Sequence, residues 1–245
     1  MTPRQAASDI FEQITAVRAQ GREPVVIFDL DGTLYDNSHR MLRILQEYAH
    51  EPSQSTPGLL DAAREASVAN VAYKMTGTLK NLGFDDPDLA RSAEAYWAQR
   101  FFTNAYLGYD LPVKGGCAFA HAVRDAGGTP TYLTGRDAGN MLLGTAAALQ
   151  RDGFPVGTVD TRIILKPDFE TPDRVFKKGV LGALATTSVV VGVFDNEPGL
   201  CNMFKETHPE ASVFWLDMPH APNPPPLRDD VVVTPNFEAL LGSPG

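Results

Sequence analysis

The chain has 245 residues, of which 43% are hydrophobic and 21% are charged, a composition typical of a globular protein with a sizeable core. Its formal net charge of −9 argues against nucleic acid or an anionic membrane as the main partner, because both attract basic surfaces. The two cysteines, the lack of a membrane-length apolar run and the lack of a signal-peptide pattern predict a cytoplasmic protein with reduced thiols.

The first part of the chain predicts an amphipathic helix followed by a buried strand. Apolar residues recur at helical spacing over residues 5–19, and Gly21 ends that pattern. Residues 25–28 form a continuous apolar run, as in a strand that is buried on both faces of a parallel sheet. Asp29 and Asp31 follow this run. Because residues two apart at the end of a strand point the same way, their carboxylates should leave the sheet side by side.

The pattern of hydrophobic residues changes over residues 37–111, where helical periodicity recurs and no convincing strand is found. Residues 59–79 and 89–102 are the clearest predicted helices. An insertion of this length exceeds the dozen or so residues of an ordinary crossover, so we predict an all-α subdomain at 37–111, inserted between core segments 1–36 and 112–245. We expect the cationic side chains of this subdomain to form a solvated helix face, with the alternative left open that one of them reaches into the cleft: Lys74, Lys80, Arg91 and Arg100. Its aromatic side chains are expected to form its own core rather than a substrate platform: Trp97, Phe101 and Phe102.

Strands and helices alternate again from Leu111 onward, which predicts a central parallel sheet flanked by helices. A short helix is predicted near Phe237. The expected fold class is therefore α/β, with an inserted all-α unit. The remaining strands are predicted at residues 129–134, 161–165, 189–194 and 212–216.

Polar residues suited to phosphoryl transfer follow three of the predicted strands. Asp29 and Asp31 follow the first strand, Thr134 ends the second and Asp195 follows the fourth. These ends converge on the edge where α/β sheets bind ligands. We predict that Asp29 is a nucleophile that forms an aspartyl-phosphate, that Asp31 is the general acid and base, and that Thr134 and nearby backbone N–H groups bind the phosphoryl oxygens.

The same carboxylates predict a Mg²⁺ site, because Mg²⁺ prefers hard oxygen ligands and two like charges held close together need a cation. The predicted ligands are Asp29, Asp195 and the backbone carbonyl of Asp31. A lysine should complete the site by screening the nucleophile and the phosphate.

These motifs resemble those of the haloacid dehalogenase superfamily, in its phosphatase branch. The first motif is Phe-Asp-Leu-Asp-Gly-Thr-Leu at 28–34, the second is Leu-Thr-Gly-Arg at 133–136, and the acidic fourth is Val-Phe-Asp-Asn-Glu-Pro at 193–198. The resemblance implies a Rossmann-like core, a cap at 37–111 that closes over the site, and a small soluble phosphorylated substrate. Dehalogenase members lack the second carboxylate of the first motif, so Asp31 favours phosphate chemistry.

The third motif of this family is a single lysine, for which the sequence offers three candidates. Lys177 is favoured, while Lys166 and Lys178 stay open as alternatives. The fourth motif departs from the family pattern in having Asn196 as its second residue, which is expected to weaken metal affinity.

The loop after Thr134 is expected to bind substrate through Gly135 and Arg136, and an ion pair between Arg136 and a neighbouring Asp is an equal alternative. Together these features predict a Mg²⁺-dependent phosphomonoester hydrolase acting on a small soluble metabolite, with neither nucleic acid nor a membrane as its partner. Two alternatives remain open at this stage: a phosphomutase on the same scaffold, and a binding or regulatory module with weakened metal binding.

Overall fold

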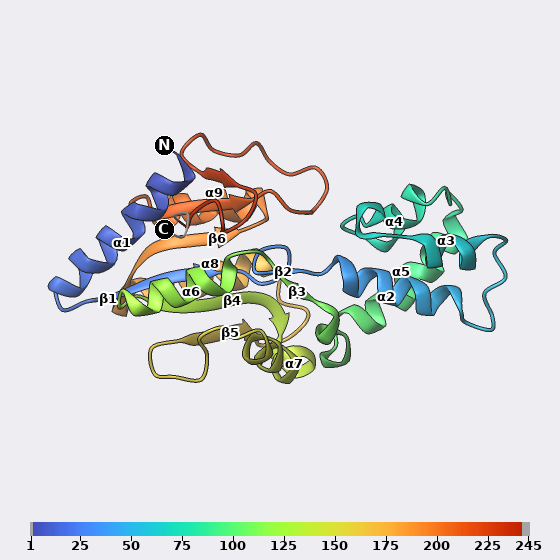
Figure 1. Cartoon of the computed structure of the whole chain (residues 1–245), viewed down its shortest axis with the longest axis horizontal. Helices are drawn as coiled ribbons and strands as arrows, with labels where there is room; N and C mark the ends of the chain where they lie inside the picture. The colour runs from blue at the N-terminus through green and yellow to red at the C-terminus, as the bar shows by residue number, and fades with distance from the viewer. Residues whose placement is uncertain (1, 242–245) are drawn as a thin grey trace.

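The core of the protein is a six-stranded parallel sheet with the strand order β5-β4-β1-β6-β7-β8 (Figure 1). The computed structural model describes residues 2–241. The sheet is parallel, as the alternation of strands and helices predicts, and β1 lies in its interior, paired with β4 on one side and β6 on the other. The strands are β1 (Glu23–Phe28), β4 (Thr129–Asp137), β5 (Arg162–Lys166), β6 (Ser188–Asp195), β7 (Ser212–Leu216) and β8 (Val232–Thr234).

Both faces of β1 are buried, which explains its uninterrupted apolar sequence. Val26 and Phe28 point into a cluster on one face, and Val25 and Ile27 point into a second cluster on the other. The ring of Phe28 stacks on Phe194 of β6, with 5.2 Å between the ring centroids. The strand that carries the paired carboxylates is thus held rigidly in the middle of the sheet.

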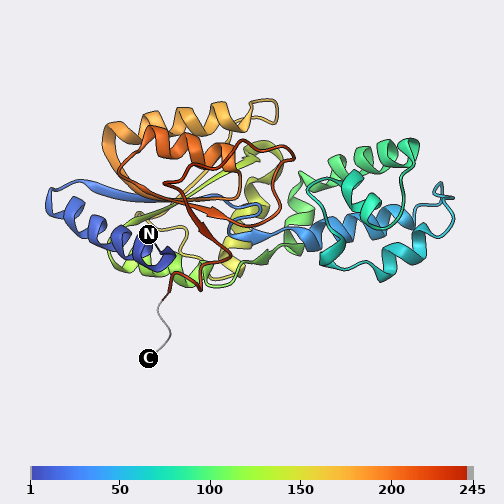
Figure 2. The same ribbon diagram turned by 90° about the horizontal axis from the view of Figure 1, so that it is seen from above.

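Helices cover the two faces of the sheet in separate layers (Figure 2). Helices α1 (Pro3–Ala19), α6 (Gly116–Asp125) and α7 (Ala138–Arg151) contribute apolar side chains to the first cluster. Helices α8 (Asp173–Thr187) and α9 (Pro198–Thr207) contribute to the second. The Rossmann-like α/β core predicted from the sequence is confirmed.

The residues between β2 (Tyr35–Asp36) and β3 (Leu111–Pro112) form a helical unit that lies beyond one end of the core (Figure 1). β2 and β3 pair with each other in antiparallel fashion, so the two chain segments that lead to and from this unit run side by side. The unit has an apolar cluster of its own that includes Leu45, Leu79 and Leu89. It contains α2 (Ser38–Ala49), α3 (Leu59–Glu65), η1 (Val68–Asn70), α4 (Met75–Asn81), α5 (Pro87–Phe101) and η2 (Asn104–Tyr109).

Two sequence predictions about local structure are wrong. The helix predicted over 59–79 is interrupted, because Ala66 adopts an extended conformation and a short 3₁₀ turn separates α3 from α4. The helix predicted near Phe237 is a set of turns, and Phe237 instead packs as a buried ring in the first cluster. No helix within residues 2–241 combines the length and the apolar character needed to cross a lipid bilayer.

Candidate active site

The end of β1 carries Asp29 into a buried ion-pair cluster with residues from two other elements. The Asp29 backbone N–H donates to the carbonyl of Phe194 at 2.9 Å, which continues the sheet pairing past the end of the strand. The Nζ of Lys177, from the second turn of α8, lies 2.7 Å from Asp29 Oδ1 and 2.7 Å from Asp195 Oδ2. Two carboxylates therefore share one ammonium group at the carboxyl edge of the sheet.

Burial and the neighbouring opposite charges shift the pKa values of Asp29 and Lys177 in opposite directions. Burial, together with the nearby charge of Asp195, raises the pKa of Asp29 to about 7, although Lys177 opposes the shift. Burial alone would lower the pKa of Lys177, but the charges of Asp195 and Asp29 outweigh it and hold the lysine in its charged form. With both carboxylates ionised, the cluster carries a net negative charge, which favours the binding of a further cation.

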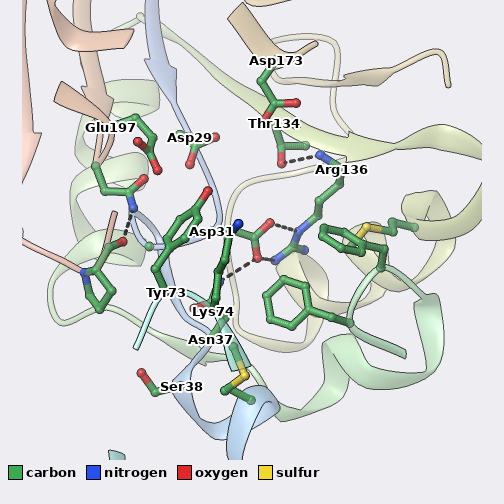
Figure 3. A pocket seen from close by; sticks show the side chains of 18 of the residues that line it. Asp29, Asp31, Asn37, Ser38, Tyr73, Lys74, Thr134, Arg136, Asp173 and Glu197 are labelled. Carbon is green, nitrogen blue, oxygen red and sulfur yellow. Dashed lines mark hydrogen bonds and ion pairs between the residues drawn. The ribbon is translucent and has the colours of Figure 1, made fainter. Parts of the chain in front are cut away.

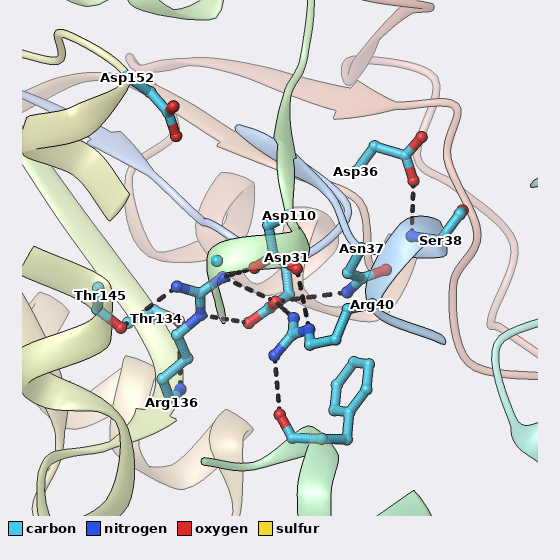
Figure 4. A network of polar contacts seen from close by, with 12 residues as sticks. Asp31, Asp36, Asn37, Ser38, Arg40, Asp110, Thr134, Arg136, Thr145 and Asp152 are labelled. Atoms are coloured by element: carbon cyan, nitrogen blue, oxygen red, sulfur yellow. Dashed lines mark hydrogen bonds and ion pairs between the residues drawn. The ribbon is translucent and has the colours of Figure 1, made fainter. Parts of the chain in front are cut away.

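Asp31 lies two residues further on, and its carboxylate is held by two arginines (Figure 4). Arg136 donates from Nε to Asp31 Oδ2 at 2.8 Å and from Nη2 to Oδ1 at 3.0 Å. Arg40, in the first turn of α2, donates to Asp31 Oδ1 as well. Asp31 thus contacts the core through one arginine and the helical unit through the other.

Asp110 completes this network from the segment that returns to the core. One of its oxygens lies 2.9 Å from Arg136 Nη2, and the other lies 2.9 Å from Arg40 Nε, without the alignment of a hydrogen bond. Burial opposes ionisation of Asp31, but the charges of Arg136 and Arg40 dominate and hold its pKa well below its usual range. For Asp110 burial dominates and raises the pKa to about 6.

Strand β4 is longer than the predicted strand at residues 129–134. It continues to Asp137, and its pairing with β5 shifts register after Thr134. The Thr134 hydroxyl lines the cavity described below and accepts a hydrogen bond from the Arg136 backbone N–H at 3.2 Å. Gly135 has no room for a side chain, because a Cβ there would collide with the Asp173 carboxylate. Arg136 is engaged with Asp31 and Asp110, which is the ion-pair alternative left open by the sequence.

The three candidate lysines lie in three different environments. Lys177 is buried between Asp29 and Asp195. Lys166 pairs with Asp173 at 2.9 Å and donates to the carbonyls of Phe169 and Thr171, so it closes the loop between β5 and α8. Lys178 is exposed on α8.

Asn196 lies beside the turn that follows Asp31. Its amide nitrogen donates to the Pro219 carbonyl at 2.6 Å, and the side chain is buried. Gly32 adopts a φ of 75°, and a Cβ at this position would collide with the Asn196 amide. Asn196 therefore packs against the turn, with its amide nitrogen bonded to Pro219, and it lines the same cavity as Asp29.

A cavity of about 380 Å³ opens beside Asp29, between the core and the helical unit (Figure 3). Figure 3 shows the Tyr73 ring entering from the helical unit, with its hydroxyl directed toward Asp29. Burial and the surrounding carboxylates raise the pKa of Tyr73 to about 12, so this hydroxyl stays protonated at neutral pH. Lys74, expected from its sequence to lie on a solvated face, also lines the cavity, as do Trp97, Phe101 and Phe102.

Sequence reasoning missed Arg40, Asp110 and Tyr73. Arg40 stands among ordinary amphipathic helix residues, and nothing in its local pattern separates it from a solvated arginine. Its side chain is nevertheless 0% exposed, because α2 begins directly over the Asp31 turn. The burial of such residues depends on how the helical unit packs against the core, and a local sequence pattern does not encode this packing.

Replacing Arg40 with Met is expected to lower the free energy of unfolding by about 3 kcal/mol, since it leaves buried carboxylates with one cation fewer. Urea denaturation at pH 7 measures the change. The matched control is Arg43→Met on the same helix, whose partly exposed pair with Glu47 contributes less than about 1 kcal/mol. Equal losses for the two variants would contradict a structural role for the buried network.

Comparison with known proteins identifies the fold. No protein-family model matches the sequence, and no curated protein matches it. A candidate phosphatase from Clostridium difficile aligns with a TM-score of 0.57 over 90% of this chain and 99% of its own, at 13% identity. A candidate haloacid dehalogenase-like hydrolase from Burkholderia xenovorans aligns with a TM-score of 0.52 over 90% of this chain and 100% of its own, at 16% identity.

A class C acid phosphatase from Bacillus anthracis, with tungstate bound, aligns with a TM-score of 0.44 at 19% identity; the match covers 79% of this chain and 61% of that one. This chain therefore spans less than two thirds of the length of that enzyme. The other two alignments, both above a TM-score of 0.5, cover 90% of this chain and 99–100% of the neighbour's chain. The chain has the fold of the haloacid dehalogenase-like hydrolases, as its motifs predict.

Proposed function

We propose that the protein is a Mg²⁺-dependent phosphomonoester hydrolase that works through an aspartyl-phosphate on Asp29. The observation that carries this proposal is the buried cluster of Asp29, Lys177 and Asp195 at the carboxyl edge of the sheet, next to a cavity large enough for a small metabolite. The phosphatase and hydrolase folds among the structural neighbours support the same reaction class.

In the proposed reaction the Asp29 carboxylate attacks phosphorus and the alcohol leaves, which forms an acyl phosphate on the enzyme. The Thr134 hydroxyl and the neighbouring backbone N–H groups bind the phosphoryl oxygens. Lys177 opposes protonation of the Asp29 carboxylate and offsets the charge that accumulates between this carboxylate and the phosphate. Water then attacks phosphorus, which releases inorganic phosphate and restores Asp29.

Asp31 has the role of acid and base in this proposal. In its ion pair with Arg136 and Arg40 the carboxylate is ionised but weakly basic, because the two positive charges hold its pKa low. Both steps, donating a proton to the leaving alcohol and accepting one from the attacking water, therefore require these ion pairs to loosen. Because Arg40 belongs to α2, we propose that residues 37–111 act as a cap whose position adjusts the basicity of Asp31.

The residues present fit a Mg²⁺ ion. The Asp29 and Asp195 carboxylates and the Asp31 backbone carbonyl are all oxygen donors, and the two carboxylates share a single cation. Within residues 2–241 no cluster of three or more His, Cys, Asp or Glu side chains has the geometry of a metal site. A Mg²⁺ site with two carboxylates matches that finding, because Mg²⁺ usually keeps several waters and takes substrate phosphate as a ligand. When bound, the ion would neutralise charge on the phosphoryl oxygens.

Release of phosphate from p-nitrophenyl phosphate tests the proposal. We expect turnover with Mg²⁺ that EDTA abolishes, and free inorganic phosphate as the product. At limiting Mg²⁺, kcat/KM should rise with pH through about 7, because Asp29 attacks only when ionised; saturating Mg²⁺ should move this rise to lower pH.

Each alternative function has its own outcome in this assay. Phosphate recovered on an acceptor sugar, with none released to water, would establish a phosphomutase. An absence of turnover across a broad panel of phosphate esters with Mg²⁺ would favour a binding or regulatory module.

A further inference from the structure

The cavity beside Asp29 has two chemically different walls. The core contributes polar groups around the reacting position, including Asp29, Thr134 and Lys177. The opposite wall is mainly aromatic and thioether in character. It is formed by Met41, Trp97, Phe101 and Phe102 of the helical unit, together with Phe169 from the loop between β5 and α8. We call these five residues the aromatic wall.

The rings of this wall contact one another across the boundary between the helical unit and the core. Phe102 meets Trp97 edge to face at a centroid distance of 5.3 Å, and it meets Phe169 in the same way at 5.1 Å. Phe169 nevertheless remains 50% exposed. An aromatic ring left half open beside a cavity offers a face or an edge to a further flat group.

Polar groups on the same side of the cavity are few. The helical unit contributes four: Asn37, Ser38, Tyr73 and Lys74. Asn37 is directed to Asp31, to which its amide donates at 3.4 Å, Ser38 is buried, and the Tyr73 hydroxyl is directed toward Asp29. Lys74 suits the phosphate better than a neutral alcohol, because it is a cation. An alcohol with many hydroxyls would therefore have to leave several of them without partners against the aromatic wall, which carries a large free-energy penalty. A flat apolar group would lose nothing there and would gain contact area.

We propose that the substrates are phosphomonoesters of alcohols bearing an aromatic ring, and that the aromatic wall binds this ring. This inference rests on the proposed hydrolase function for its turnover readout. A cavity of about 380 Å³ lies within the range that holds small ligands, so it accommodates the ring together with the phosphate. The aromatic wall then selects the alcohol, while the core residues act on the phosphate that all substrates share.

The test compares 2-phenylethyl phosphate with ribose 5-phosphate, two primary alkyl esters of similar size and similar intrinsic reactivity. We expect kcat/KM to favour the aromatic ester by at least about tenfold. Phe169→Ala should remove about tenfold of kcat/KM for the aromatic ester and change that for ribose 5-phosphate by less than about twofold. Leu143→Ala, which removes an exposed apolar side chain outside the cavity, is the control and should change neither value.

Equal or better turnover of ribose 5-phosphate would overturn the inference, as would a Phe169→Ala variant that lowers both values alike. Binding of the two esters to Asp29→Asn protein, measured by titration calorimetry, separates this inference from the proposed function. Tenfold tighter binding of the aromatic ester without turnover of either ester by the wild type would refute the hydrolase and retain the aromatic wall. Turnover of both esters with equal affinities would retain the hydrolase and refute the aromatic wall.

Discussion

Replacing Asp29 with Asn is expected to lower the kcat for p-nitrophenyl phosphate by at least about 10³-fold, because an amide cannot attack phosphorus. The substitution keeps the size of the side chain, and Lys177 retains its 2.7 Å contact with Asp195, so the fold should be preserved. Steady-state kinetics with Mg²⁺ measure the loss. In acid-quenched samples, protein-bound phosphate that hydroxylamine removes should be present for the wild type and absent for the variant.

Asp217→Asn is the matched control for this prediction. Asp217 follows β7 as Asp29 follows β1, but it lies outside the cavity. Its replacement should leave kcat within about twofold of the wild type, because surface substitutions away from a site rarely matter. If Asp29→Asn keeps its activity while the control behaves as expected, the nucleophile is another residue.

Replacing Lys177 with Met is expected to lower kcat by about 10²–10³-fold, because the variant loses a fixed positive charge beside both the nucleophile and the phosphate. It should also lower the free energy of unfolding at neutral pH by about 3–5 kcal/mol, since Asp29 and Asp195 would face each other without a counterion. This loss of stability should shrink at acidic pH, where protonation of a carboxylate removes the repulsion. Kinetics and urea denaturation at two pH values measure the effects.

Lys166→Met and Lys178→Met are the matched controls. Lys166 ends β5 and donates to the Phe169 carbonyl in the loop that follows. Its ion pair is with the half-exposed Asp173, so replacing it should have a moderate effect on turnover and stability. Lys178 is exposed on the same helix as Lys177, so its replacement should leave both kcat and stability almost unchanged. A larger loss of turnover for Lys166→Met than for Lys177→Met would place the motif lysine at 166.

The sequence predicted the parts of the site that belong to single strands. Asp29 follows an apolar run that can only be buried, and the period of two along a strand sets the direction of Asp31. The same reasoning predicted the sheet and the helical nature of the insertion. It could not predict where β4 ends, because the register shift after Thr134 depends on pairing with β5.

Contacts between segments that are distant in the sequence could not be predicted from local patterns. Asp31 was predicted as the general acid and base, and an ion pair of Arg136 with a neighbouring Asp was left open; the structure binds Asp31 to Arg136 of strand β4 and also to Arg40 of helix α2. Trp97, Phe101 and Phe102 were expected to form the interior of the helical unit rather than a surface that binds substrate. Trp97 and Phe101 do pack against its apolar cluster, but all three rings also line the cavity.

The sequence by itself determined the α/β fold and the residues expected at the strand ends, because periodicity and strand termini are local properties of the chain. The tertiary structure decided which lysine meets Asp29 and which arginines hold Asp31. Lys177 is 148 positions from Asp29, and Arg136 is 105 positions from Asp31. Such pairs form only when the strands and helices of the core are assembled, since the free energy of a buried ion pair depends on burial and geometry that no local segment possesses.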